Sequence, residues 1–128
     1  MKAIDMHSHL STRKGFLFKS PEELRMLEQV YKFKVVYKTE EEMAQDFRQA
    51  GVKSILAGPF SKTIEETREN HDYVAQMVRD YPDAFLGAWA DIYPALGLAG
   101  LRELERCIKD LGMVGLSFFA SFSGIPYN

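Results

Sequence analysis

TEEEMAQDFRQAGVKSILAGP, residues 39–59, contains a helix followed directly by a strand, and this unit decides the fold class. A capping-box pattern begins the helix at Thr39, and Gly51 provides a left-handed end for it. Val52–Ala57 is a short apolar run of the kind that forms a buried strand, and Gly58-Pro59 ends it. The stretch therefore predicts one αβ step of a layered α/β protein.

The same alternation continues on both sides of this unit. Capping patterns predict further helix starts at Ser20 and Thr63, and another helix carries an apolar stripe from Leu98 to Leu111. The expected strands are Lys2–His7, Val52–Ala57, Ala84–Asp91 and Met113–Phe119. Strands that alternate with helices favour a parallel sheet with right-handed crossovers. We predict an α/β fold of parallel βα units, with a helical insertion at about residues 11–38.

Composition and charge suit one globular domain. The chain has 128 residues, 46% of them hydrophobic, and a net charge of -2 at pH 7. Mixed charges without a basic cluster disfavour nucleic-acid and membrane partners, and no apolar run approaches the ~18 residues of a membrane span. The single cysteine, Cys107, is expected to be a small helix residue. Because the start of the chain lacks a secretory-signal pattern, we expect a cytoplasmic location.

Polar residues at the end of the first strand are the main candidates for chemistry. Side chains alternate along a strand, so Asp5, His7 and His9 are expected on one face and Ser8 on the other. Two imidazoles at this spacing can bind one divalent ion, and a carboxylate lower on the same face could orient one ring. We therefore predict His7 and His9 as metal ligands and Asp5 as their outer partner. The other reading is a solvated or hydrogen-bonded pair.

These residues also carry a family resemblance. Ile4-Asp5-Met6-His7-Ser8-His9-Leu10 resembles the Asp-x-His-x-His motif of the amidohydrolase superfamily. Further segments resemble its amidohydrolase-related branch, which includes aminocarboxymuconate-semialdehyde and resorcylate decarboxylases; they are Asn70–Val74, Tyr81–Gly87, Glu103–Arg106 and Gly112–Leu116. The resemblance spans nearly all of the chain.

The resemblance implies a (β/α)8 (TIM) barrel with a divalent metal, usually zinc, bound by the two strand-one histidines. Family members take further ligands from the fifth and eighth strands and catalyse hydrolysis or decarboxylation. It thus implies a metal-dependent hydrolase or decarboxylase of a small carboxylated substrate, aromatic or acyl.

The chain corresponds to only the N-terminal half of such a barrel, strands one to four. It stops at Asn128, about half of a ~250-residue barrel. We expect the exposed sheet edges to be covered by a missing C-terminal half or by a second copy, and the isolated chain to be inactive. The third histidine, His71, falls in the apolar stripe of a helix and is expected to be a packed or partly exposed helix residue. No catalytic base is assigned.

Three further residues near strand ends are weaker candidates for a substrate pocket. Phe60 follows the second predicted strand, and Trp89 and Asp91 share one side of the third. Core packing is the more common reason for a large aromatic residue such as Trp89 or Phe60. For Asp91, a cap or turn bond before Pro94 is an equally good explanation. Basic residues in the insertion, such as Arg13 and Lys14, could meet an acidic substrate, although a solvated loop is the simpler interpretation.

The competing functional class is a non-catalytic α/β module that self-associates or serves as a scaffold. Its support is the incomplete ligand set of the chain. It predicts a folded protein without bound metal, whose stability does not change when a chelator is added. No glycine-rich nucleotide motif is present, so a nucleotide-binding version has little support.

Overall fold

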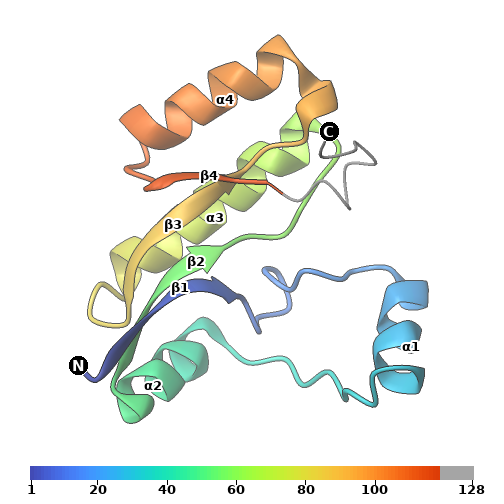
Figure 1. Cartoon of the computed structure of the whole chain (residues 1–128), viewed down its shortest axis with the longest axis vertical. Helices are drawn as coiled ribbons and strands as arrows, with labels where there is room; N and C mark the ends of the chain where they lie inside the picture. Colours follow the sequence, from blue (N-terminus) through green and yellow to red (C-terminus); the bar gives the residue numbers. More distant parts are fainter. Residues whose placement is uncertain (119–128) are drawn as a thin grey trace.

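A computed structural model describes residues 1–118, and its centre is a four-stranded parallel sheet in the order β1-β2-β3-β4. The strands are β1 (Ala3–His9), β2 (Val52–Ala57), β3 (Phe85–Asp91) and β4 (Gly115–Ser117). The helices are α1 (Pro21–Gln29), α2 (Glu40–Ala50), α3 (Ile64–Asp80) and α4 (Leu98–Lys109), with a short 3-10 turn η1 at Pro94–Leu96. Each strand pairs with the next in the chain, which confirms the predicted parallel βα order (Figure 1).

Helix starts follow the predicted capping chemistry. Ser20 and Thr39 each form a full capping box at the start of α1 and α2. Thr63 accepts from the Glu66 N–H, but the Glu66 carboxylate bonds the Ser61 hydroxyl at 2.7 Å, so the third capping box is only half formed. Gly51 ends α2 at φ 69°, as its place before β2 predicted.

Strand bounds differ from expectation at both ends of the sheet. β1 continues to His9 instead of ending at His7, which places both histidines on the strand itself. β4 covers only Gly115–Ser117 of the predicted Met113–Phe119, and Phe119 lies outside the described residues. The pairing of β4 with β3 accounts for these bounds, because only Gly115 to Ser117 have ladder partners.

The core lies between the sheet and the helices. α2 packs beside β2, and α3 packs beside β3. Leu56, Ala88 and Ala90 on the strands are buried with helix residues such as Val74 and Met77. Alternation then directs the intervening strand residues to the opposite face, which we call the inner face of the sheet.

The insertion after β1 extends away from the sheet. It contains α1, which has no buried residue, and a bridge between Thr12 and Lys38 brings its two ends together. Figure 1 shows α1 well separated from the sheet, with long connecting segments on either side. The insertion is therefore held at its base, next to the end of β1.

Two bulges interrupt the regular alternation of side chains. The β1–β2 ladder pairs Asp5 with Ser54 and then Ser8 with Leu56, so β1 advances three residues while β2 advances two. A similar shift between β2 and β3 occurs at Ser54. The first bulge corrects the prediction that Asp5 shares a face with His7 and His9 while Ser8 points away. Asp5 and Ser8 align with Ser54 and Leu56, and the Ser8 hydroxyl donates to the Asp5 carboxylate at 2.5 Å, whereas His9 aligns with Ala57 on the opposite face.

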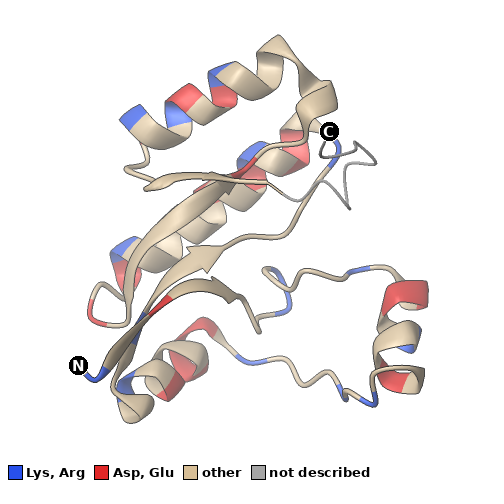
Figure 2. Cartoon of the chain, in the orientation of Figure 1, with Lys and Arg blue, Asp and Glu red and all other residues tan. Residues whose placement is uncertain are grey.

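Surface charges are mixed, as the composition predicted. Figure 2 shows both signs on each of the four α-helices. No helix in the described part of the chain is long and apolar enough to cross a membrane. Several apolar side chains at the two sheet edges remain exposed, among them Ile4, Met6, Leu116 and Phe118.

Candidate metal centre

His7 and His9 come together at the carboxyl end of β1. Their ring centroids lie 4.9 Å apart and the rings meet edge to face, with an interplanar angle of 82°. Two imidazoles that each place a nitrogen about 2.0–2.1 Å from one zinc ion have centroids roughly 5 Å apart in tetrahedral geometry. The distance between the two rings therefore matches that of two ligands of one divalent ion. Among residues 1–118, no third histidine, cysteine or carboxylate forms a ligand group with them.

The electrostatics of His9 favour the form that binds metal. Burial lowers the pKa of His9, the neighbouring His7 lowers it further, and the Asp5 carboxylate opposes both effects. A lowered pKa keeps the imidazole neutral at physiological pH, and only the neutral ring offers a nitrogen lone pair to a cation.

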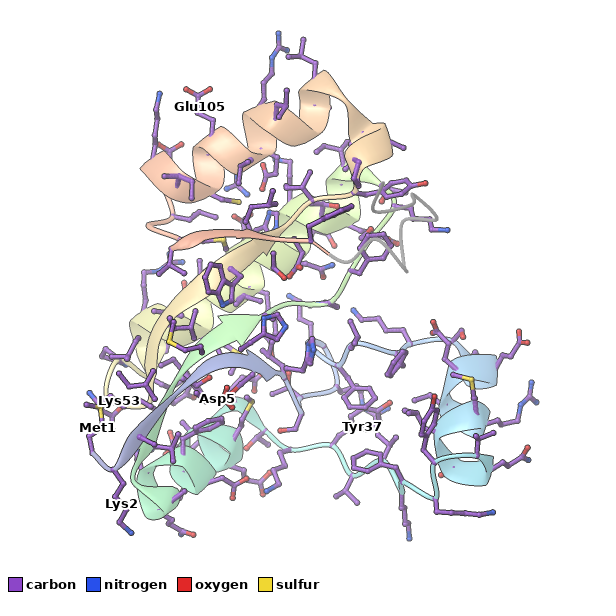
Figure 3. All side chains as sticks on the ribbon, viewed as in Figure 1. Met1, Lys2, Asp5, Tyr37, Lys53 and Glu105 are labelled. Carbon is purple, nitrogen blue, oxygen red and sulfur yellow. The ribbon has the colours of Figure 1, made fainter. Side chains whose placement is uncertain are left out.

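Asp5 is engaged by its own strand. It accepts from the His7 backbone N–H at 3.0 Å and from the Ser8 hydroxyl. The Ser8 bond, followed by the His7 bond, lowers the pKa of the Asp5 carboxyl. Figure 3 labels Asp5 on the β1 ribbon. These contacts bind the carboxylate to the bulge, and a role as outer partner of a metal-bound imidazole stays a prediction.

Trp89 lies on the inner face together with His9. Ladder pairing places His9 opposite Ala57 and Ala57 opposite Trp89, and side chains in register point to the same face. The Trp89 indole N–H donates to the Met6 carbonyl at 2.8 Å, so the side chain reaches from β3 to β1. Trp89 thus contacts the backbone next to His7.

Asp91 follows two residues later on the same face and is 8% exposed. Burial raises its pKa to about 7, against the lowering effects of the Ser117 hydroxyl and the Gly58 N–H. Its Oδ2 is buried without a hydrogen-bond partner among the described residues. A proton on this carboxyl relieves the cost of an unpaired buried charge, so Asp91 is a candidate proton-holding group.

Phe60 has a different environment. Its ring packs edge to face on Tyr93, with centroids 5.6 Å apart, in the loops that follow β2 and β3. The structure thus brings His7, His9 and Trp89 together at β1, while Phe60 packs beside η1.

The insertion adds an apolar cavity that the sequence analysis did not predict. Its volume is about 430 Å³, within the range of small-molecule pockets. It is lined by His9 and by Phe16, Leu17, Phe18, Leu27, Tyr31 and Phe33. The spacing of aromatic residues between 16 and 33 was the available signal, but it does not reveal that they gather around His9.

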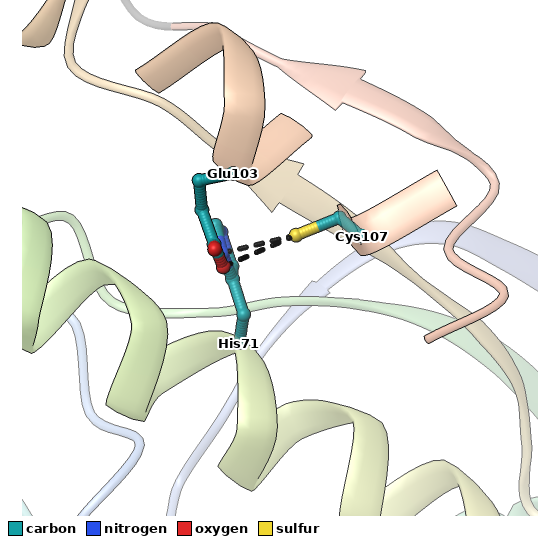
Figure 4. Close-up of side chains that lie close together, drawn as sticks. All are labelled: His71, Glu103 and Cys107. Carbon is teal, nitrogen blue, oxygen red and sulfur yellow. Dashed lines mark hydrogen bonds and ion pairs between the residues drawn. The ribbon is translucent and has the colours of Figure 1, made fainter. Parts of the chain in front are cut away.

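A second cluster of potential ligands lies between α3 and α4 (Figure 4). His71 Nδ1 is 2.8 Å from Glu103 Oε1 and 3.1 Å from Cys107 Sγ. All three residues are buried, so His71 is packed rather than partly exposed, and Cys107 is a small helix residue as expected. Burial lowers the pKa of His71 and raises that of Cys107 to about 12, so the thiol keeps its proton.

Hydrogen bonds already occupy the donor atoms of this cluster. The Asp91 N–H donates to His71 Nε2 at 3.1 Å, which leaves the ring proton on Nδ1 to bond Glu103. Arg106 donates to both carboxylate oxygens of Glu103, at 2.7 and 2.9 Å. A saturated network with a protonated thiol and a neighbouring guanidinium fits an ion poorly. The cluster instead ties α3 and α4 to the end of β3.

Comparisons with known proteins give matches among solved structures. No protein-family model matches the sequence, and no curated protein matches it. A provisionally assigned amidohydrolase from Staphylococcus aureus superposes with a TM-score of 0.60 over 91% of this chain, at 22% sequence identity. A 2,6-dihydroxybenzoate decarboxylase, in complex with 2,6-dihydroxybenzoate, gives a TM-score of 0.51 over 88% of the chain, at 24% identity.

These matches cover only part of the larger structures. The chain spans 36% of the length of the first protein and 37% of the second. At these identities the likeness concerns the fold, and it agrees with the resemblance seen in the Asp-x-His-x-His stretch. The chain therefore has the fold of a half-barrel of four parallel βα units, like the matching part of these two larger structures.

Proposed function

We propose that this chain forms the N-terminal part of a metal-dependent hydrolase or decarboxylase that acts on a small carboxylated substrate, aromatic or acyl. The observation that carries the proposal is the placement of the His7 and His9 rings at the end of β1, where His9 also lines the apolar cavity of the insertion. Ligand nitrogens next to an apolar pocket match what such an enzyme needs at its reactive centre. The divalent metal is expected to be zinc.

The residues of this chain would bind the metal and orient the substrate. His7 and His9 would supply two neutral nitrogens, and the bound ion would act as a Lewis acid or activate water. Phe16, Phe18 and Phe33 would hold the apolar body of the substrate beside His9 and exclude water from it.

The preference for a carboxylated substrate has support in the cations of the insertion. The Arg13 guanidinium lies 4.5 Å from the centroid of the Tyr37 ring, and Tyr37 packs on Phe16 with centroids 5.7 Å apart. The Arg13 charge thus lies over Tyr37, and Tyr37 in turn packs on Phe16, which lines the cavity. It would favour a substrate whose ring or acyl chain enters the cavity while its carboxylate stays near the charge.

The remaining ligands would come from a further part of the barrel. Within the described residues, β1 and β4 each pair with one neighbour only, which leaves two sheet edges to be covered. We propose that a C-terminal half-barrel or a second copy of the chain covers them. We also propose a cytoplasmic setting, which suits the single buried thiol of Cys107.

Metal content per chain tests the proposal directly. Protein purified without added metal or a metal-binding tag is analysed by plasma mass spectrometry, alone and after incubation with zinc and gel filtration. We expect zinc to bind and the His7→Ala/His9→Ala double variant to lose it. His71→Gln is the matched control, because it removes an imidazole from the buried cluster and should leave zinc binding unchanged.

Two results would contradict the proposal. Zinc that stays bound in the double variant but is lost in His71→Gln would assign the ion to the buried cluster. Zinc that binds the His7→Ala/His9→Ala double variant as tightly as the wild type would show that these two histidines do not hold the ion.

A further inference from the structure

We propose that Trp89 is a positioning residue for the His7–His9 pair and acts by holding the Met6 carbonyl in the β1 bulge. The inference deepens the metal role proposed above and rests on it in part. The geometry itself, however, can be tested without metal. Trp89 is distant from β1 in sequence, and its indole N–H contacts the backbone directly before His7 at 2.8 Å.

The bulge leaves backbone groups of β1 to be bonded by side chains. Met6 and His7 lie between the ladder pairs formed by Asp5 and Ser8. The His7 N–H donates to Asp5, and the Met6 carbonyl accepts from Trp89. Bulges commonly redirect side chains next to functional sites. These two side chains therefore hold the strand where the pair of imidazoles begins.

Only a long side chain with a donor at its far end can make this contact. β1 and β3 are separated by β2, so the distance to cross is about 10 Å at ordinary strand spacing. Ala57 lies between His9 and Trp89 in the ladder, so the indole must cross β2 to reach the Met6 carbonyl. Phenylalanine could occupy the same space but has no donor.

The indole is also confined from the β4 side. A Cβ built on Gly115 would lie 3.1 Å from Trp89 Cζ3, which is a tight contact. The ring thus lies between the Gly115 backbone and the Met6 carbonyl, and its position is set from both directions. Because β4 pairs with β3 through Trp89 and Gly115, the bulge in β1 is linked to the far strand of the sheet.

The test uses the 128-residue chain and the variant Trp89→Phe, which keeps an aromatic ring and removes the N–H. Co²⁺ is the probe, and its affinity is measured by titration of the visible absorption of the bound ion. Outer partners of metal ligands typically change affinity 10- to 100-fold when replaced. We expect Co²⁺ to bind the variant about 10-fold more weakly, or weaker still. Tyr81→Phe, a change of an aromatic residue at the end of α3, should leave the affinity unchanged.

Two metal-free measurements separate this inference from the proposed function. The chain has one tryptophan, so its single indole N–H signal in NMR is unambiguous. We expect nuclear Overhauser effects from this proton to Met6 and His7 in the wild type, and shifted His7 and His9 signals in Trp89→Phe. If the wild type binds no Co²⁺ but these shifts occur, the proposed metal role fails and the positioning role stands.

Other results would overturn the inference. Unchanged Co²⁺ affinity together with unchanged histidine signals would mean that Trp89 does not position the pair. If Trp89→Phe does not fold, the indole N–H signal of the wild-type protein still tests whether Trp89 bonds to Met6. Absence of a nuclear Overhauser effect between its N–H and the protons of Met6 and His7 would show that the bond to Met6 is not formed.

Discussion

The end of β1 and the buried cluster between α3 and α4 both combine histidine with a carboxylate, yet their chemistry differs. At the end of β1, the rings of His7 and His9 face each other beside a cavity, while the Asp5 carboxylate bonds to the strand. In the cluster, the His71 ring is bonded on both nitrogens and Glu103 is bonded to Arg106. The comparison teaches that ligand-type residues in proximity are not sufficient for a metal centre: in the buried cluster, hydrogen bonds within the protein already occupy the His71 nitrogens and the Glu103 oxygens.

The largest expected effect is a loss of folding stability when the hydrogen-bond network of the buried cluster is broken. Glu103→Ala leaves Arg106 and His71 without their shared carboxylate partner. Breaking a buried ion pair by removing one member costs about 3–5 kcal/mol in the free energy of unfolding. Urea unfolding of the variant measures this loss. A loss below about 1 kcal/mol would mean that the network contributes little, whereas Glu103→Gln, which keeps the acceptor oxygen, should be milder.

The pH dependence of stability tests Asp91, whose backbone N–H bonds the buried cluster. Its N–H bonds His71, and its carboxyl has a pKa raised to about 7. The folded state therefore binds a proton that the unfolded state releases near pH 4. The resulting stabilisation is complete below about pH 4 and is lost as pH rises to about 7.

We expect this difference to be about 2–4 kcal/mol in the wild type and absent in Asp91→Asn, by urea unfolding at several pH values. His71 contributes the opposite slope, because its pKa is lowered and its stabilisation is lost as pH falls below about 6.5. The difference in the free energy of unfolding between the wild type and Asp91→Asn at each pH removes the contribution of His71, which both proteins share. Parallel pH profiles would contradict a raised pKa for Asp91.

A smaller effect is expected for the carboxylate at the bulge. Asp5→Asn keeps one acceptor oxygen and removes the charge from an exposed side chain that bonds His7 and Ser8. A hydrogen bond of this kind contributes about 1 kcal/mol. We therefore expect a loss of about that size in thermal or urea unfolding. A loss as large as that of Glu103→Ala would place the two carboxylates in the same structural role.

The smallest effect on stability is expected for the imidazoles themselves. Both His7 and His9 are exposed, so the double alanine variant should change the free energy of unfolding of the metal-free protein by less than about 0.5 kcal/mol. Urea unfolding in the presence of chelator measures this difference. A large loss would indicate that the pair serves the fold and would weaken the proposed metal role.

Local patterns explain why much of the fold could be predicted. Thr39 and Gly51 bound α2 as expected, because capping depends on residues within one turn of each other. The parallel order of the strands followed from the alternation of helices and strands. The proximity of His7 and His9 was likewise contained in their two-residue spacing along β1.

The sequence by itself therefore determined the βα order, most helix ends and the adjacent histidine pair, since each depends on neighbours in the chain. Tertiary structure alone decided the bulge at Asp5–Ser8, the reach of Trp89 to Met6 and the cavity of the insertion around His9. It also decided that His71 would be bonded by residues of α4 and β3. These features depend on strand register and on packing between distant segments, and a register shift of one residue changes which side chains meet.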